Sequence, residues 1–179
     1  MSGIVNSTGA VSGIIGTTVG TPAGAAGSIV QTSSVTTGVN TTNVGTTNLT
    51  FVVTVVSAAF TPTYNNSDVI LHARFGRAVY NTTSDSGLAL KWQRAISGGA
   101  TTYPTSLSDH ETGSTYSNIY IGSATGQFYN HISHTMLDSP ATDSAITYTL
   151  YAAPMGSEGT YVGGGNNSRW WIFFQEVKR

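Results

Sequence analysis

Few side chains in this sequence have both the chemistry and the setting of a catalytic group. The acids that could form the carboxylate pair of a glycoside hydrolase are Asp109, Glu111, Asp138 and Asp143. Such a pair must be held about 5–9 Å apart in a cleft, and these acids lie in polar, turn-rich stretches that predict no cleft. The chain also lacks the Gly-x-Ser-x-Gly motif that holds the nucleophile of many hydrolases. We therefore expect no catalytic residue and no enzymatic activity.

Metal-binding chemistry is also poorly supported. The sequence has no cysteine, and its four histidines are His72, His110, His131 and His134. His131 and His134 are three residues apart in a predicted strand, so their side chains point to opposite faces and cannot bind one metal ion together. A site on a threefold axis, with one His or Asp from each of three chains, is the remaining alternative. We expect no metal and no cofactor.

A polar loop around residue 110 carries the side chains best suited to bind a sugar. Asp109, His110 and Glu111 are consecutive there, and the alternating carboxylates could hold a sugar hydroxyl or a cation. Tyr103 precedes them and could stack on a sugar ring. The simpler alternatives are a solvated loop for the charged residues and a place in the sandwich or an interface for Tyr103.

The composition excludes several classes of function. Only 8% of the residues are charged, against about 25% in an average soluble domain. The net charge of −1 leaves no basic surface that could neutralise phosphates, so we expect no binding to nucleic acid. No apolar run approaches the roughly 18 residues of a membrane-spanning helix, so we expect no membrane insertion. With 39% hydrophobic residues, the chain can nevertheless build a core.

The charged residues are distributed unevenly, since the first of them is Asp68. Residues 1–27 are rich in glycine and cannot bury enough surface to fold alone, which predicts an extended anchoring arm that becomes ordered on binding. Two similar tetrapeptides, at residues 2–5 and 12–15, contain the most apolar pairs of this arm. Those pairs, which we expect to contact another protein, are Ile4, Val5, Ile14 and Ile15. Residues 28–179 then form the domain.

This domain has the sequence pattern of strands separated by turns. Runs rich in β-branched and aromatic residues alternate with stretches rich in Gly, Asn, Asp and Ser, and no window has a helical period of 3.6 residues. The predicted strands are 28–37, 48–60, 69–80, 88–96, 116–121, 128–137, 145–152 and 169–177. About eight strands without helices between them predict an all-β fold, and we expect a jelly-roll sandwich.

The last of these strands predicts an oligomer. Alternate residues of a strand point to opposite faces, so both faces of residues 170–174 are large and apolar. One face fits the core of the sandwich, and the other needs a second cover. Residues 98–115 of the same chain are one candidate for that cover, and another copy of the chain is the other. The expected interface residues are Trp170, Trp171, Ile172, Phe173, Phe174 and Tyr148, without a choice between the two faces.

Three arginines lie within otherwise apolar predicted strands, and they are Arg74, Arg77 and Arg94. Paired arginines at an interface can fix the register between subunits. The acids considered as their partners in another subunit are Asp85, Asp109 and Glu111. The alternative is that these arginines point to solvent at the edge of the sandwich.

The sequence also resembles a known group of proteins. Residues 138–151, with the sequence DSPATDSAITYTLY, a following Gly-rich loop and a closing strand near Glu176 and Val177 are similar to small structural proteins of marine and cyanobacterial bacteriophages. The opening residues 1–7, MSGIVNS, resemble the start of such proteins. The group resembles the C1q/TNF-like jelly rolls, which form trimers with the last strand in the sheet that faces the threefold axis. One departure is that no heptad pattern precedes the β-domain.

This resemblance implies a structural role in a virion. The expected protein is a homotrimer that is made in the host cytoplasm and binds other capsid or tail proteins through residues 1–27, at the virion surface. Capsid decoration, a head fibre and a short tail fibre are all compatible with it. The alternative function is that of a fibre tip that attaches the phage to a host-surface glycan.

Overall fold

The computed structural model describes residues 26–37, 42–45, 49–51, 53–82, 86–104, 117–121, 126–155, 160–162 and 170–179. The predicted anchoring residues Ile4, Val5, Ile14 and Ile15 lie outside these ranges, as do the predicted loop residues Asp109, His110 and Glu111. All regular structure in the described ranges is β-strand. That part of the chain has no helix long and apolar enough to cross a membrane.

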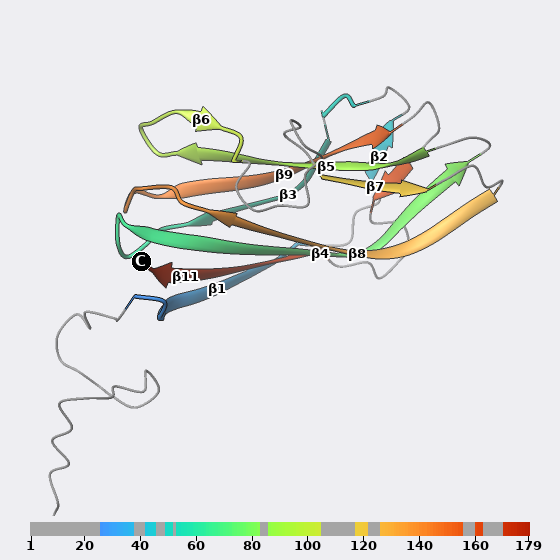
Figure 1. Cartoon of the computed structure of the whole chain (residues 1–179). Helices are drawn as coiled ribbons and strands as arrows, with labels where there is room; N and C mark the ends of the chain where they lie inside the picture. The colour runs from blue at the N-terminus through green and yellow to red at the C-terminus, as the bar shows by residue number, and fades with distance from the viewer. Residues whose placement is uncertain are drawn as a thin grey trace, which may run out of the picture.

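Eleven strands make up the described structure (Figure 1). They are β1 (Ile29–Thr37), β2 (Thr42–Gly45), β3 (Val53–Phe60), β4 (Ser67–Thr82), β5 (Ser86–Ile96), β6 (Thr101–Thr102), β7 (Ser117–Ile121), β8 (Gly126–Asp138), β9 (Ile146–Met155), β10 (Thr160–Val162) and β11 (Trp170–Lys178). The eight with five or more residues coincide with the eight predicted strands, with shifts of a few residues at their ends. The short strands β2, β6 and β10 were not predicted.

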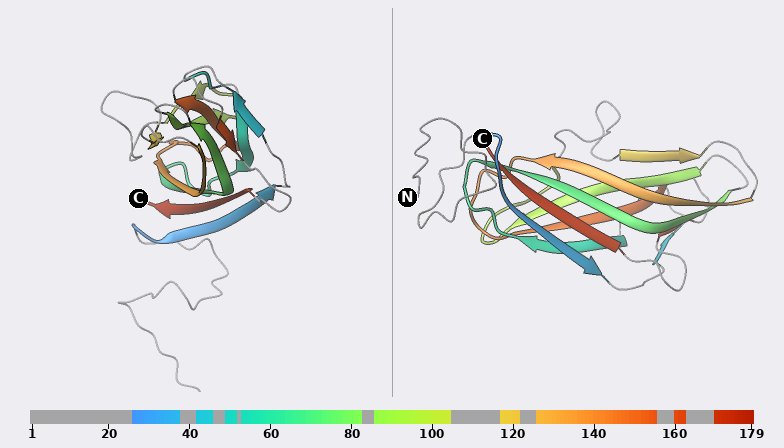
Figure 2. Two further views of the ribbon diagram at one scale, coloured as in Figure 1. Left: turned by 90° about the vertical axis from the view of Figure 1, so that its right-hand side faces the viewer. Right: turned by 90° about the horizontal axis from the view of Figure 1, so that it is seen from below.

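The strands form two antiparallel sheets that pack face to face (Figures 1 and 2). In the first, here the β11 sheet, the order is β1-β11-β4-β10-β2, and β8 pairs with the other edge of β4. In the second, here the β9 sheet, the order is β3-β9-β5-β6, and β7 also pairs with β5. Strands distant in the sequence are neighbours in each sheet, which is typical of a jelly roll. The all-β prediction is confirmed, and the arrangement is that of a jelly-roll-like sandwich.

The core lies between the two sheets and follows the period-two pattern of their strands. In β11 the buried residues are Trp170, Ile172 and Phe174, as the alternation predicts. The ring of Phe174 stacks on that of Phe60 from β3, with ring centroids 5.1 Å apart, and lies 5.9 Å from that of Tyr148 in β9. One face of the last strand is therefore covered by the opposite sheet of the same chain.

Polar groups join the two sheets where β5 faces β8. The Arg94 Nη1 atom donates to both carboxylate oxygens of Asp138, at 2.7 and 3.0 Å, and the Tyr148 hydroxyl donates to Asp138 Oδ2 at 2.7 Å. Burial, together with the adjacent Asp138 carboxylate, raises the pKa of Tyr148 far above its ordinary value. Arg94 thus pairs within its own chain. Both sequence interpretations of Arg94, a partner in another subunit and a place in solvent, are wrong because β5 and β8 approach each other across the sandwich.

A second buried carboxylate fixes the end of β11. Glu176 accepts hydrogen bonds from the backbone N–H groups of Thr63 and Tyr64 at 2.8–3.0 Å, and from the Gln31 side chain at 2.7 Å. Burial raises the pKa of the Glu176 carboxyl, but these hydrogen bonds outweigh that effect and hold it below its ordinary value. The contacts tie β11 to β1 and to the connection between β3 and β4.

Candidate functional site

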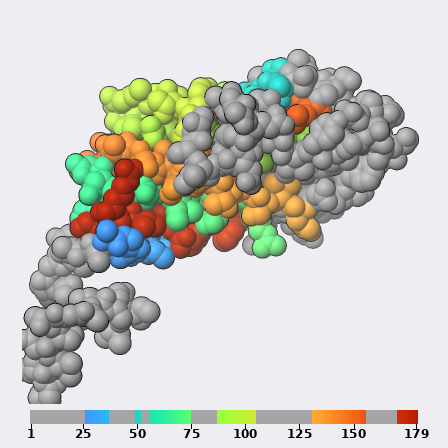
Figure 3. Space-filling model, in the orientation of Figure 1, coloured from blue at the N-terminus to red at the C-terminus, as the bar shows by residue number. Residues whose placement is uncertain are grey.

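The structure divides the six predicted interface residues into two groups. Trp170, Ile172, Phe174 and Tyr148 are buried between the sheets of their own chain and are not available to a partner. Trp171 and Phe173 lie on the opposite side of β11, where Trp171 is 37% exposed and Phe173 is half-buried. The second face of β11 is therefore the one that the described structure leaves partly exposed. Figure 3 shows part of β11 (red) at the surface beside β1 (blue).

The strand register places other side chains in rows with these two aromatic residues. Trp171 pairs with Arg74 in β4, which pairs with Ser133 in β8. Two residues further along β11, Phe173 pairs with His72, which pairs with Thr135. Directly paired residues of antiparallel strands project on the same side of the sheet. We call this outward surface, with the neighbouring His131, the β11 face, and its residues are His72, Arg74, His131, Ser133, Thr135, Trp171 and Phe173.

The aromatic side chains of the β11 face contact one another. The rings of Trp171 and Phe173 are stacked with centroids 6.0 Å apart, and the ring of His72 lies 6.2 Å from that of Phe173. The His72 Nδ1 atom is also 2.9 Å from the Thr135 hydroxyl oxygen. His72 thus contacts both the Phe173 ring and Thr135, and Trp171 packs on Phe173.

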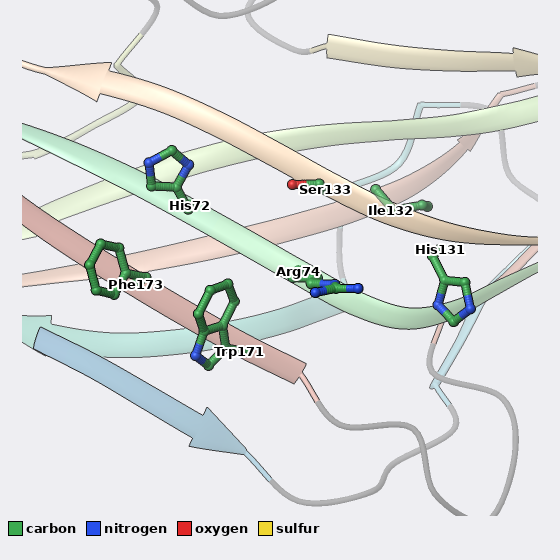
Figure 4. Close-up of a pocket in the computed structure, with 7 residues that line it drawn as sticks. All are labelled: His72, Arg74, His131, Ile132, Ser133, Trp171 and Phe173. Atoms are coloured by element: carbon green, nitrogen blue, oxygen red, sulfur yellow. The ribbon is translucent and has the colours of Figure 1, made fainter.

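The β11 face contains an open pocket of about 370 Å³ (Figure 4). Its lining consists of Ile132 and six residues of the face: His72, Arg74, His131, Ser133, Trp171 and Phe173. Figure 4 shows the Arg74 side chain lying along the sheet between Trp171 and His131. The pocket thus combines an apolar wall with a guanidinium, two imidazoles and a hydroxyl, and no carboxylate lines it.

Arg74 differs from the other basic side chains in the described part of the chain. Arg94 and Arg179 bind carboxylates, whereas the ammonium groups of Lys91 and Lys178 lie over aromatic rings at 4.0 and 4.6 Å. Among the Lys and Arg side chains that the structure describes, Arg74 has no ion pair, hydrogen bond or ring contact. It is an exposed guanidinium beside two exposed or half-exposed aromatic rings.

The described part of residues 98–115, which were one of the two candidate covers for β11, covers the other sheet instead. A tight turn with Gly98 at φ +73° follows β5 and leads back to Tyr103. The Tyr103 ring lies beneath the Lys91 ammonium group, and its hydroxyl accepts a hydrogen bond of 3.2 Å from Gln93. Both partners belong to β5 in the β9 sheet, so residues 98–104 leave Trp171 and Phe173 uncovered.

The prediction that His131 and His134 point to opposite faces of their strand is confirmed. His131 is exposed on the β11 face, and His134 points into the sandwich, where its Nδ1 atom accepts a hydrogen bond of 2.9 Å from the Trp92 indole. No three His, Cys, Asp or Glu side chains of the described ranges lie close enough together to hold a metal ion.

Sequence reasoning singled out Trp171 and Phe173 but did not connect them with His72, Arg74 or Ser133. The alternation within residues 69–80 places His72 and Arg74 on one face, but only the strand order brings them beside β11.

Comparisons with known proteins add no assignment. No protein-family model matches the chain, and no curated protein is significantly similar to it. Its function must therefore be argued from the β11 face and from the sequence.

Proposed function

We propose that this protein is a structural component of a bacteriophage virion, a homotrimer that associates through the β11 face and binds the particle through residues 1–27. The proposal includes no catalytic role. Its C1q/TNF-like aspect rests on the resemblance of the sequence, and the position of β11 in one sheet with β1, β4 and β8 is compatible with it.

The observation that carries the trimer is the outward exposure of Trp171 next to Phe173. The free energy falls when a large aromatic side chain leaves water. Aromatic residues at the centre of an interface commonly contribute about 2–4 kcal/mol each to the free energy of binding. Trp171 is 37% exposed and Phe173 is half-buried, so the described part of the chain covers this pair only partly. A second and third copy would supply the apolar cover that the chain itself lacks.

The uncharged arm supports the particle-bound part of the proposal. The hydrogen bonds between Gly27 and Lys178 and between Lys178 and Ser28 place the start of the described chain at the end of β11. The preceding residues contain no charged side chain, so burying these side chains against another protein desolvates no ionised side chain. In this proposal three arms on one trimer bind the particle together, which strengthens the attachment.

Sedimentation of purified protein tests the trimer. Wild-type chains are expected to sediment as a trimer at micromolar concentration, and Trp171→Asp is expected to give folded monomers because it places a charge in the interface. Thr147→Asp is the matched control, since Thr147 is exposed in β9 on the other sheet. A wild-type monomer at these concentrations, or dissociation of both variants alike, would contradict the proposed interface.

Deletion of residues 1–27 tests the arm separately. The shortened protein is expected to remain a folded trimer. Immunogold labelling of purified particles is expected to detect the full-length protein and not the shortened one. Monomers after the deletion would assign assembly to the arm, and shortened protein retained on particles would contradict anchoring.

A second proposal is attachment to a host glycan, and one observation favours it. Tyr103 is 45% exposed and lies beside Lys91 and Gln93, so an aromatic surface and two polar groups face solvent together. Purified protein should then bind host cells and compete with infection, and Tyr103→Ala should weaken both effects. Equal binding by wild type and variant would remove Tyr103 from this role.

A further inference from the structure

The pocket on the β11 face has the chemistry of an anion site. The Arg74 guanidinium presents donors to it, and the Ser133 hydroxyl and the imidazoles of His72 and His131 complete its polar lining. Planar guanidinium groups bind phosphate, sulfate and carboxylate through paired hydrogen bonds. The Trp171 and Phe173 rings form the apolar wall of the pocket.

The described acids of the β11 sheet cannot neutralise Arg74. Asp68 lies six residues away along β4, about 20 Å for an extended strand, and binds Arg179 and Ser139. Asp138 is buried and is bound by Arg94 and Tyr148, and Glu176 is buried among its own hydrogen-bond donors. Each of these carboxylates is engaged elsewhere, so no described acid of this sheet supplies a counter-charge to Arg74.

A trimer built on this face increases the need for that counter-charge. In a cyclic trimer all copies are equivalent, so the three Arg74 side chains lie at the same level along the axis. Like charges that approach one another in a region with little water repel strongly. A multivalent anion opposes this repulsion, whereas a monovalent anion neutralises only one guanidinium.

We propose that the Arg74 pocket binds a free multivalent oxyanion of the phosphate or sulfate class, and that this ion stabilises the trimer. The second part rests on the proposed trimer, and the first part does not. Because the ion binds the assembled face better than the separated one, trimer stability increases with its concentration.

Sedimentation equilibrium with sodium phosphate as the probe tests this proposal. Wild-type protein is compared in 1–10 mM phosphate, sulfate, acetate and chloride at constant ionic strength and pH. Millimolar concentrations matter because molar sulfate strengthens all apolar association. Phosphate and sulfate are expected to lower the trimer dissociation constant at least tenfold relative to chloride, with little effect of acetate.

Arg74→Gln is the decisive variant, because Arg74 is exposed and its replacement leaves the core intact. Its trimer should form equally well in all four anions, and calorimetry should detect phosphate binding by wild type and not by this variant. Arg74→Lys should keep a weakened response, since it retains the charge without the planar fork. The same anion response in wild type and Arg74→Gln, no response in wild type, or an acetate effect equal to that of phosphate would each overturn the proposal.

The outcomes also separate this proposal from the trimer itself. A wild-type trimer that ignores phosphate would overturn the anion site and leave the proposed function standing. Wild-type monomers in every anion, with calorimetric phosphate binding that Arg74→Gln abolishes, would overturn the trimer and leave the pocket.

Discussion

The two faces of the β11 sheet differ in whether their polar and aromatic groups have partners within the chain. On the inward face, Asp138 is bound by Arg94 and Tyr148, and the Trp92 indole donates to His134. On the outward face, Arg74 has no partner among the described residues, and Trp171 is exposed next to Phe173.

The difference shows which interactions are complete within one chain. Most buried polar groups are paired, because an unpaired one costs free energy whenever the chain folds, although the buried Arg94 Nε atom has no hydrogen-bond partner in the described structure. Groups on the outer face bear no such requirement until another molecule covers them. Substitutions on the inward face should therefore lower the free energy of unfolding, and those on the outward face should weaken assembly and leave folding nearly unchanged.

The outer face of the β9 sheet differs from the β11 face. Its side chains engage one another, since the hydroxyl oxygens of Ser57 and Thr149 are 2.9 Å apart and Lys91 lies over the Tyr103 ring. Exposed Thr147 on the same outer face provides the control position for the experiments on the β11 face.

The largest expected effect on the free energy of unfolding comes from the inward face of β11. Phe174→Ala should lower the free energy of unfolding by about 4 kcal/mol, since it leaves a cavity beside Phe60 and Tyr148. Trp171→Ala should lower the free energy of unfolding of the monomer by less than about 1 kcal/mol and weaken the trimer instead. Chemical denaturation and sedimentation of both variants measure the two effects. Equal losses of unfolding free energy would erase the distinction between the faces.

The next effect concerns the buried ion pair. Asp138→Asn should lower the free energy of unfolding by about 3 kcal/mol, because it leaves the Arg94 charge buried without its counter-ion. Denaturation is measured in the Trp171→Asp background, so that assembly does not contribute. Combining Asp138→Leu with Arg94→Met should recover much of the loss by removing both charges. A double variant as unstable as Asp138→Asn would show that the charge pair was not the cause.

A smaller effect should depend on pH. Because the folded pKa of Glu176 is below its ordinary value of 4.5, its stabilising contribution is complete above pH 4.5. It is lost as the pH falls from that value through the lower folded pKa. Glu176→Gln should lower the free energy of unfolding by about 2 kcal/mol at pH 7 and reduce its dependence on pH below 4.5. An unchanged acid transition in this variant would assign the pH dependence to other carboxylates.

The smallest effect is expected at the exposed ion pair of Asp68 and Arg179, in which Asp68 Oδ1 lies 2.6 Å from Arg179 Nε. Asp68→Asn should change the free energy of unfolding by less than about 1 kcal/mol, because solvent screens exposed charges. Denaturation in 0.05 and 0.5 M salt provides the measurement. If Asp68→Asn lowered the free energy of unfolding as much as Asp138→Asn does, solvent exposure would not explain the difference expected between the two ion pairs.

The strands were predictable because their pattern is local. Alternation within residues 170–174 identified which side chains of β11 share a face, and the same pattern separated His131 from His134. The strands β2, β6 and β10 were missed because two to four residues contain too little alternation to recognise.

The candidate site was only partly predictable because it depends on which strands become neighbours. Arg74 lies 97 residues before Trp171 in the chain, and only the pairing of β4 with β11 brings them together. The partner of Arg94 was mispredicted for a related reason. Asp138 contacts it from the opposite sheet, and no pattern within a single strand identifies a contact between sheets.

The bonds between Gly27 and the end of β11 also determine how the fold carries mechanical load. If the arm holds the protein on a particle, tension enters the domain at residue 26 and runs along β1. The β1–β11 ladder, which pairs residues from Ile29 with Val177 to Thr37 with Trp170, then resists in shear, with its hydrogen bonds loaded together. A force that pulled Gly27 sideways from Lys178 would open the same ladder one bond at a time, so the direction of pull sets the strength of the attachment.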